Sequence, residues 1–200
     1  MNNDLINYLR THIGQSLSPD NAADIMVLAD RIPSLVSPEE IERVQAEQCG
    51  EFTFAVEKIE DIENEVRPLH QAHWDETEGH RHGLELKPDY ETFARYERAG
   101  RYILFTLRRD GRLLGNCAMY LDKSTHTQTL IATEDTLYIL PEARRGRVAH
   151  KFVAYVENSL KQLGAREIHI TVKTVNKAGR FFGMLGYRHV ENGLTKVLED

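Results

Sequence analysis

The chain has 200 residues, of which 41% are apolar and 28% charged, with a formal net charge of −6 at pH 7. This composition is that of a globular domain, and its negative charge argues against broad affinity for nucleic acid, which needs a basic face. Because no apolar run approaches the ~20 residues that span a bilayer and the N-terminus lacks the pattern of a signal peptide, we expect a cytoplasmic protein that does not contact membranes.

The first fifty residues predict helices separated by turns and contain no ionisable constellation. The clearest helix begins at Ser37, where Glu40 completes a capping box, and we expect it to end at Gly50. We therefore predict a helical extension for packing or oligomerisation over residues 1–50 and the main domain over residues 51–200. Whether the protein is a homodimer stays open.

From Glu51 onward, the spacing of apolar residues predicts a strand and then two helices. Residues 52–56 alternate as a strand does, and residues 59–78 have helical spacing with an expected break at Pro68. A further helix is closed by Gly100, which is a typical C-terminal residue.

The middle of the chain predicts three antiparallel strands and a long helix. Two strand-like runs are joined by Asp110-Gly111, a strong hairpin signal, and a third strand is interrupted by the polar group at residues 133–135. Apolar residues then recur at helical spacing from Val148 until Gly164.

The last part of the chain predicts a strand, a short helix and two short strands. Ile168, Ile170 and Val172 share one face of the strand, Asn176 opens the helix, and the final strands fall within residues 187–198. This order of elements is typical of an α/β or α+β domain with a mixed sheet.

The stretch PEARRGRVAH places a basic loop at the start of the long helix. A helix N-terminus presents unpaired N–H groups and partial positive charge, Gly146 permits a tight turn, and Ala149 lets a ligand approach the backbone. Arg144, Arg145 and Arg147 add charge that suits phosphate oxygens. Basic side chains at a helix N-terminus are unfavourable for an isolated helix, which favours an anionic ligand over a plain solvated charge run.

Here the sequence resembles the GCN5-related N-acetyltransferase (GNAT) superfamily, whose signature is Gln/Arg-x-x-Gly-x-Gly/Ala. Arg144 and Ala149 fit the signature, whereas Arg147 replaces the middle glycine and Gly146 lies one place early. The stretches HQAHWDETEGH and EDTLYILPEARRG are also similar to GNAT proteins encoded by phages.

A second motif strengthens the resemblance. NKAGRFFGMLGY is similar to the family pattern Asn-x-x-Ala/Gly-x-x-x-Tyr-x-x-x-Gly-Phe/Tyr, with Asn176, Gly186 and Tyr187 in place. The likeness covers about residues 51–198. It implies the GNAT fold, with a mostly antiparallel central sheet flanked by helices, and it implies acetyl-CoA as cosubstrate.

In that fold acetyl-CoA lies where the strand before the basic loop splays from its neighbour, so the resemblance also implies which residues meet the coenzyme. The residues expected there are Leu137, Ile139, Arg144, Arg145, Gly146, Arg147, Val148, Ala149, Asn176 and Phe182.

The resemblance further implies a carboxylate on the central strand that takes the proton of the acceptor amine. Glu134 and Asp135 occupy this stretch, and since adjacent strand residues point to opposite faces we favour Glu134, with a solvated bulge or salt bridge as the alternative. The tyrosine that usually meets the leaving thiolate is replaced by Phe182. Tyr138 could donate instead, or the thiolate could leave with help from solvent alone, because an ordinary thiol has a pKa near ~8.5.

The acceptor amine is expected near the segment HWDETEGHRHGLELKPD, where acidic side chains would attract a cation and a tryptophan would pack on it. A plain solvated loop is the alternative. The residues expected there are Trp74, Asp75, Glu76 and Glu78.

Histidines and cysteines suggest little further chemistry. His73, His80 and His82 lack a cysteine partner, so we expect no metal site, and His126 and His169 are more simply surface or core residues than bases. The two cysteines lie outside any CxxC pattern, as free thiols of a reducing compartment do.

The leading hypothesis is therefore an N-acetyltransferase that moves an acetyl group directly from acetyl-CoA to a primary amine of a small molecule or protein. The alternative is a catalytically weak or inactive GNAT-fold module that binds coenzyme A and docks on a partner protein, which Phe182 and Arg147 favour.

Overall fold

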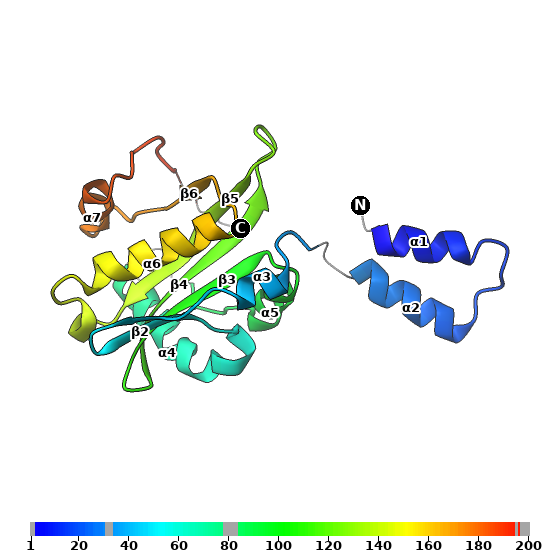
Figure 1. The fold of residues 1–200 in the computed structure, drawn as a ribbon, viewed down its shortest axis with the longest axis horizontal. Helices are drawn as coiled ribbons and strands as arrows, with labels where there is room; N and C mark the ends of the chain where they lie inside the picture. Colours follow the sequence, from blue (N-terminus) through cyan, green and yellow to red (C-terminus); the bar gives the residue numbers. More distant parts are fainter. Residues whose placement is uncertain (1–2, 31–33, 78–83, 195, 197–200) are drawn as a thin grey trace.

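The structure, a computed structural model, describes residues 3–30, 34–77, 84–194 and 196 (Figure 1). Within these residues, six strands form one sheet in the order β1-β2-β3-β4-β5-β6, in which only the pair β5–β6 is parallel. The strands are β1 (Glu47–Cys49), β2 (Phe52–Val56), β3 (Tyr102–Arg109), β4 (Arg112–Lys123), β5 (Leu130–Ile139) and β6 (Glu167–His169). The helices are α1 (Asn3–Thr11), α2 (Pro19–Asp30), α3 (Pro38–Glu42), α4 (Ile59–Thr77), α5 (Tyr90–Arg98), α6 (Val148–Gln162) and α7 (Ala178–Met184), with a 3-10 turn η1 (Pro141–Ala143). The predicted class, a mixed and mostly antiparallel sheet flanked by helices, is confirmed.

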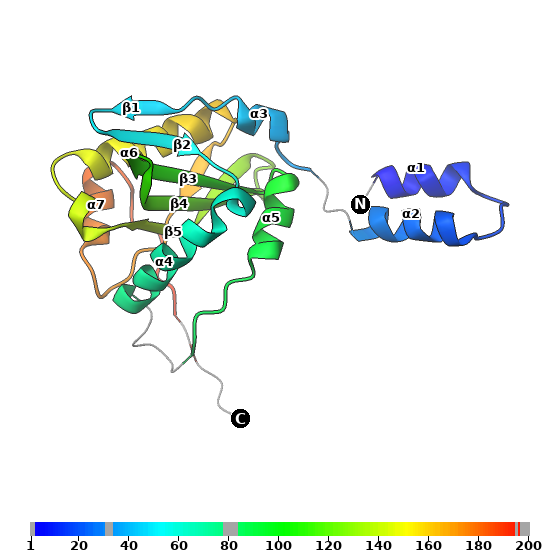
Figure 2. The same cartoon turned by 90° about the horizontal axis from the view of Figure 1, so that it is seen from below.

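The sheet separates two helical layers, with α6 on one face and α4 and α5 on the other (Figure 2). Strand β3 is buried on both faces because its side chains are apolar at every position from Tyr102 to Phe105. Phe105 packs towards α6, with its ring 6.0 Å from that of Tyr155, while Tyr102 belongs to the core under α4 and α5. Both cores thus depend on one strand.

The turn between β3 and β4 has the conformation that its sequence predicts. Asp110 and Gly111 have φ angles of 50° and 79°, and two successive positive φ angles are those of a type I′ hairpin turn. The predicted hairpin is confirmed.

The helix predicted from Ser37 is shorter than expected. The capping box is present, but α3 ends at Glu42, and residues 47–49 form β1, which pairs with β2 through a turn at Gly50 (φ 62°). The backbone hydrogen bonds that a sheet edge offers therefore outweighed the helical spacing of these polar residues.

The expected break at Pro68 does not occur, because α4 continues through it. Pro68 is exposed, whereas Val66 and Leu69 are buried. The carbonyl that has no helical partner can consequently bind water, and the buried apolar face holds the two halves of the helix in line.

The two strands predicted within residues 187–198 are not formed by the described residues of that segment. Val190 and Leu194 are 86% and 97% exposed.

The predicted extension contributes to the sheet and its core. Residues 35–49 pack on the domain, with Val36 and Val44 buried in the α6-side core, whereas α1 and α2 form a hairpin that stands apart in both views (Figures 1 and 2). A hydrogen bond from the Tyr8 hydroxyl to Asp24 joins the two hairpin helices. The division into residues 1–50 and 51–200 stays a prediction.

Gly100→Ala is expected to destabilise the fold strongly. Gly100 has φ 59°, and an added Cβ would lie 1.7 Å from the carbonyl oxygen of Val36. Gly50→Ala is the matched control, because Gly50 has φ 62° with open space around it. In urea unfolding, Gly100→Ala should reduce the free energy of unfolding by at least about 2 kcal/mol more than Gly50→Ala does. Equal reductions in the two variants would show that the close contact between Gly100 and the Val36 carbonyl does not require a glycine at this position.

Candidate functional site

The site is organised by a β-bulge in β5. Ala118 of β4 pairs with Thr136 and the next residue, Met119, pairs with Glu134, so Asp135 is the extra residue. A bulge breaks the alternation of side chains and re-aims them. As a result, the successive residues Asp135 and Thr136 both reach the α4 side of the sheet.

Pairing of β5 with β6 stops two residues before the bulge. The last paired residues are Thr133 and His169, and within the described chain no strand pairs with β5 beyond them on that side. The Leu140 N–H donates to the Leu114 carbonyl on β4. Since backbone groups alternate along an antiparallel ladder, those of Leu137 and Ile139 point towards the open side. This splay has the position expected for the coenzyme.

Glu134 lies at the mouth of the splay. Its carboxylate accepts a hydrogen bond of 3.4 Å from the Thr171 N–H, in the segment that follows β6. Burial is the main cause that raises the pKa of Glu134 to about 7. Its side chain is not among those lining the cavity on the α4 side.

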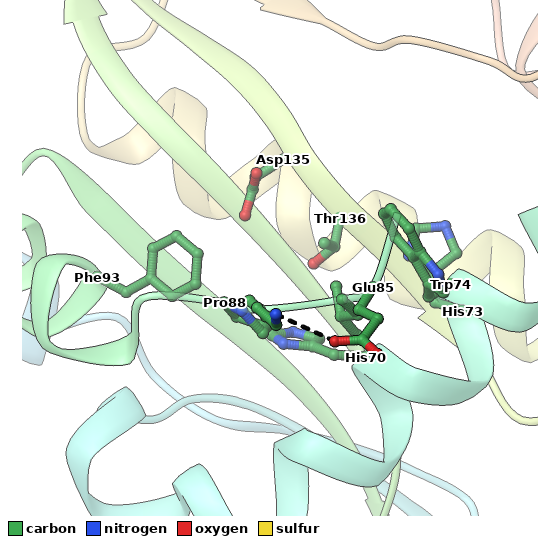
Figure 3. A pocket seen from close by; sticks show the side chains of 10 residues that line it. His70, His73, Trp74, Glu85, Pro88, Phe93, Asp135 and Thr136 are labelled. Carbon is green, nitrogen blue, oxygen red and sulfur yellow. Dashed lines mark ion pairs between the residues drawn. The ribbon is translucent and has the colours of Figure 1, made fainter. Parts of the chain in front are cut away.

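Asp135 lines a cavity of about 410 Å³ between β5, α4 and α5, which we call the β5 cavity. It faces His70 and Trp74 of α4 across this space (Figure 3). The Tyr102 hydroxyl donates to its carboxylate at 3.0 Å. Burial raises the pKa of Asp135, and the hydrogen bond from Tyr102 partly opposes this rise.

The walls of the β5 cavity are mainly aromatic and apolar. His70 lies 6% exposed, with Nδ1 3.0 Å from the Tyr90 hydroxyl, and burial lowers its pKa to about 4, so the ring is neutral at neutral pH. At the rim, Glu85 is paired with Lys87 at 3.0 Å. The lining residues are His70, His73, Trp74, Glu85, Leu86, Lys87, Pro88, Phe93, Asp135 and Thr136.

Residues 141–147, which we call the arginine loop, lead from β5 into α6. Gly146 has φ 64°, and Arg147 occupies the N-cap position of α6 without a side-chain cap. Arg145 and Arg147 are exposed. The His150 ring in the first turn of α6 contacts Phe181 of α7 at 4.9 Å, so the two sequence motifs adjoin in space. This helix N-terminus can bind an anion.

Arg144 has a different environment from its two neighbours. Its guanidinium donates to both carboxylate oxygens of Glu76, at 2.9 and 2.6 Å, and its Nε donates to the Ile139 carbonyl at 2.6 Å. Arg144 thereby holds the pKa of Glu76 below its usual value. One residue expected at the coenzyme thus binds another expected at the acceptor.

Several predicted site residues serve local structure here. Asn176 accepts from the Ala178 N–H at 2.9 Å at the start of α7, and Phe182 is buried with its ring 5.1 Å from that of Tyr187. Tyr138 is buried, and burial is the main cause that raises its pKa. Asp75 is exposed and accepts from Gln71 at 2.8 Å.

The predicted histidines and acidic residues are spread apart. Trp74 and Glu76 lie in the last turns of α4 rather than in a loop, and Glu78, His80 and His82 lie outside the described residues. His126 and His169 are exposed, the latter beside Glu167. No group of three metal-ligating side chains occurs within the part of the chain that the structure describes.

Sequence reasoning missed His70 and the α5 wall of the cavity. The spacing of His70, His73 and Trp74, three and four residues apart, would have placed them on one face of α4. Phe93 and Tyr102 carry no such signal, because the fold alone brings them to β5.

The model of the acetyltransferase (GNAT) family matches residues 60–187, more than half of the chain. The chain belongs to the GNAT family. The predicted family is therefore confirmed, while no curated protein sequence matches the chain.

Solved structures show the same fold at low sequence identity. An aminoglycoside acetyltransferase from an uncultured soil metagenomic sample, in complex with sisomicin, has a TM-score of 0.58 at 12% identity, covering 75% of this chain and 96% of that one. Ribosomal-protein-alanine N-acetyltransferase from Brucella melitensis has 0.57 at 15%, covering 74% and 99%. AAC(6')-Iy with a bisubstrate analogue of coenzyme A has 0.57 at 17%, with the same coverage.

No helix within the described ranges is both long enough and apolar enough to cross a bilayer.

The raised pKa of Glu134 predicts a pH-dependent stability. Because the folded state holds this proton up to about pH 7 and the unfolded state releases it near 4.5, stability falls as pH rises between these values. In urea unfolding, the free energy of unfolding should decrease between pH 5 and pH 8 by on the order of 2–3 kcal/mol less in Glu134→Gln than in wild type. Glu91→Gln, at an exposed position on α5, should leave the fall unchanged. An equal loss of stability between pH 5 and pH 8 in wild type and Glu134→Gln would contradict the raised pKa of Glu134.

Proposed function

We propose that this GNAT-family protein is an N-acetyltransferase that moves the acetyl group of acetyl-CoA directly to a primary amine. The observation that carries the proposal is the bulge in β5. It presents the Asp135 carboxylate to the β5 cavity on one face of the sheet, while the same strand is open at its edge beyond Thr133. Acceptor and coenzyme could therefore approach one strand from its two sides.

On the coenzyme side, the backbone groups of Leu137 are oriented to pair with an extended pantetheine arm. Arg145, Arg147 and the N-terminus of α6 supply positive charge for the pyrophosphate. The AAC(6')-Iy complex, which holds a coenzyme A bisubstrate analogue on this fold, supports this placement.

On the acceptor side, Asp135 takes the proton of the amine as the nitrogen attacks the thioester carbonyl. The new C–N bond forms, the tetrahedral intermediate collapses with cleavage of the C–S bond, and the electron pair leaves on the coenzyme sulfur. A carboxylate whose pKa is raised by burial is a better proton acceptor near neutral pH than an ordinary one. The Tyr102 hydrogen bond fixes its orientation.

The surroundings of three residues bear on how the leaving thiolate is protonated and on whether a cysteine forms a covalent intermediate. Phe182 donates nothing and Tyr138 is not among the cavity-lining residues, so we propose that the thiolate is protonated by solvent. Cys117 is buried in the α6-side core, where burial raises the pKa of its thiol, which argues against a cysteine nucleophile.

Coenzyme affinity is expected to depend on Arg145 and Arg147. In calorimetric titration with acetyl-CoA, the double variant Arg145→Ala/Arg147→Ala should bind at least roughly tenfold more weakly for each charge-assisted hydrogen bond to phosphate that it can no longer form. Arg43→Ala/Arg98→Ala removes the same net charge from exposed positions elsewhere and should bind as wild type does. A wild type that binds no acetyl-CoA at millimolar concentration would overturn the enzyme proposal.

Catalysis is expected to depend on Asp135. After a screen of amines by thiol release, Asp135→Asn should lower kcat by roughly 10²- to 10⁴-fold, and Glu134→Gln should lower it less. Tyr102→Phe removes the hydrogen bond that lowers the pKa of Asp135, so the acid limb of kcat/KM should move to higher pH. A larger decrease in Glu134→Gln than in Asp135→Asn would assign the base to Glu134. Coenzyme binding without turnover of any amine would favour the binding-module alternative.

A further inference from the structure

The ion pair between Arg144 and Glu76 joins the arginine loop to the wall of the β5 cavity. Arg144 lies directly after η1, and Glu76 lies in the last turn of α4. The turn of this helix before Glu76 carries the cavity residues His73 and Trp74. The pair thus bridges elements that are 68 residues apart in the chain.

Both side chains of the pair are partly exposed, and an isolated exposed salt bridge contributes little, but this pair has further contacts. Arg144 donates two parallel N–H bonds to Glu76 and a third to the Ile139 carbonyl, so its guanidinium group is held in one orientation. The guanidinium carbon lies 5.0 Å from the centre of the Tyr138 ring. That ring stacks at 5.5 Å on His73, which lines the cavity.

The same hydrogen bonds engage the donors with which Arg144 would bind a phosphate. All three arginines are exposed, but three N–H groups of Arg144 donate to Glu76 and to the Ile139 carbonyl. Within the described residues, Arg145 and Arg147 donate no side-chain hydrogen bond. Arg144 and its two neighbours therefore differ in role although they lie close together in sequence.

We infer that Arg144 is a positioning residue: through Glu76 it holds the last turns of α4, and with them the Trp74 wall of the β5 cavity, against the arginine loop. The inference rests on the proposed function for the identity of the two subsites, but not for the ion pair itself.

Trp74 reports on this wall directly because it is the only tryptophan of the chain. Glu76→Gln keeps the shape of the side chain and removes the charge. We expect its Trp74 emission to shift to longer wavelength and acrylamide to quench it more strongly than in wild type. Arg144→Lys, which keeps the charge but not the two parallel bonds, should shift in the same direction by a smaller amount.

The matched control is Glu65→Gln on the same helix. Glu65 also receives two parallel bonds from an arginine, Arg108, at 2.7 and 3.0 Å, but this pair lies away from the cavity residues. Both variants should have a lower free energy of unfolding than wild type, and only Glu76→Gln should change the emission of Trp74. An unchanged Trp74 signal in Glu76→Gln, or an equal change in Glu65→Gln, would overturn the inference.

Titration with acetyl-CoA separates positioning from phosphate binding. Glu76→Gln and Arg144→Ala should weaken coenzyme affinity equally and far less than Arg145→Ala/Arg147→Ala does. A large decrease in Arg144→Ala that Glu76→Gln does not share would make Arg144 a phosphate ligand and overturn the inference. If wild type binds no acetyl-CoA, the proposed function fails, while the Trp74 comparison still decides whether the pair positions the wall.

Discussion

The bulge at Asp135 is the constraint on which the rest of the site depends. In a regular strand, Asp135 and Thr136 would face opposite sides of the sheet, but the extra residue lets both line the β5 cavity. Pairing of β5 with β6 stops at Thr133, two residues before the bulge. The edge of β5 is therefore open next to the residues whose side chains the bulge redirects. A pocket on one face of β5 and a splay at its edge thus adjoin at the same part of the strand.

This arrangement brings two adjacent carboxylates into a poorly hydrated place. Burial raises the pKa of both Glu134 and Asp135, so the sheet is less stable with these groups ionised than it would be with neutral side chains. A fold optimised for stability alone would not place them there, and such local conflicts are typical of functional sites. The two environments nevertheless differ: Asp135 receives an O–H bond from the core tyrosine Tyr102, and Glu134 receives an N–H bond from the far side of the splay.

Sequence reasoning reached those features whose signals are local. The Asp110-Gly111 hairpin, the start of α6 after the arginine loop and the apolar face of that helix follow from turn chemistry and from spacing alone. The preference for Glu134 rested on regular alternation, and the geometry instead places Asp135 at the cavity, because the register of β5 is set by its pairing with β4. The ion pair between Arg144 and Glu76 could not be predicted either, because no pattern in either segment indicates that the two segments are neighbours in space.

The ion pair of Arg144 also bears on why three arginines can stand at the N-terminus of a helix in an acidic protein. Their charge opposes the helix dipole, and the conflict would be largest if all three were free. Glu76 neutralises one of them from the neighbouring helix, and Arg145 and Arg147 remain exposed. Two cations that have no ion-pair partner among the described residues lie beside the N-terminus of α6, and they match the two phosphates of a pyrophosphate.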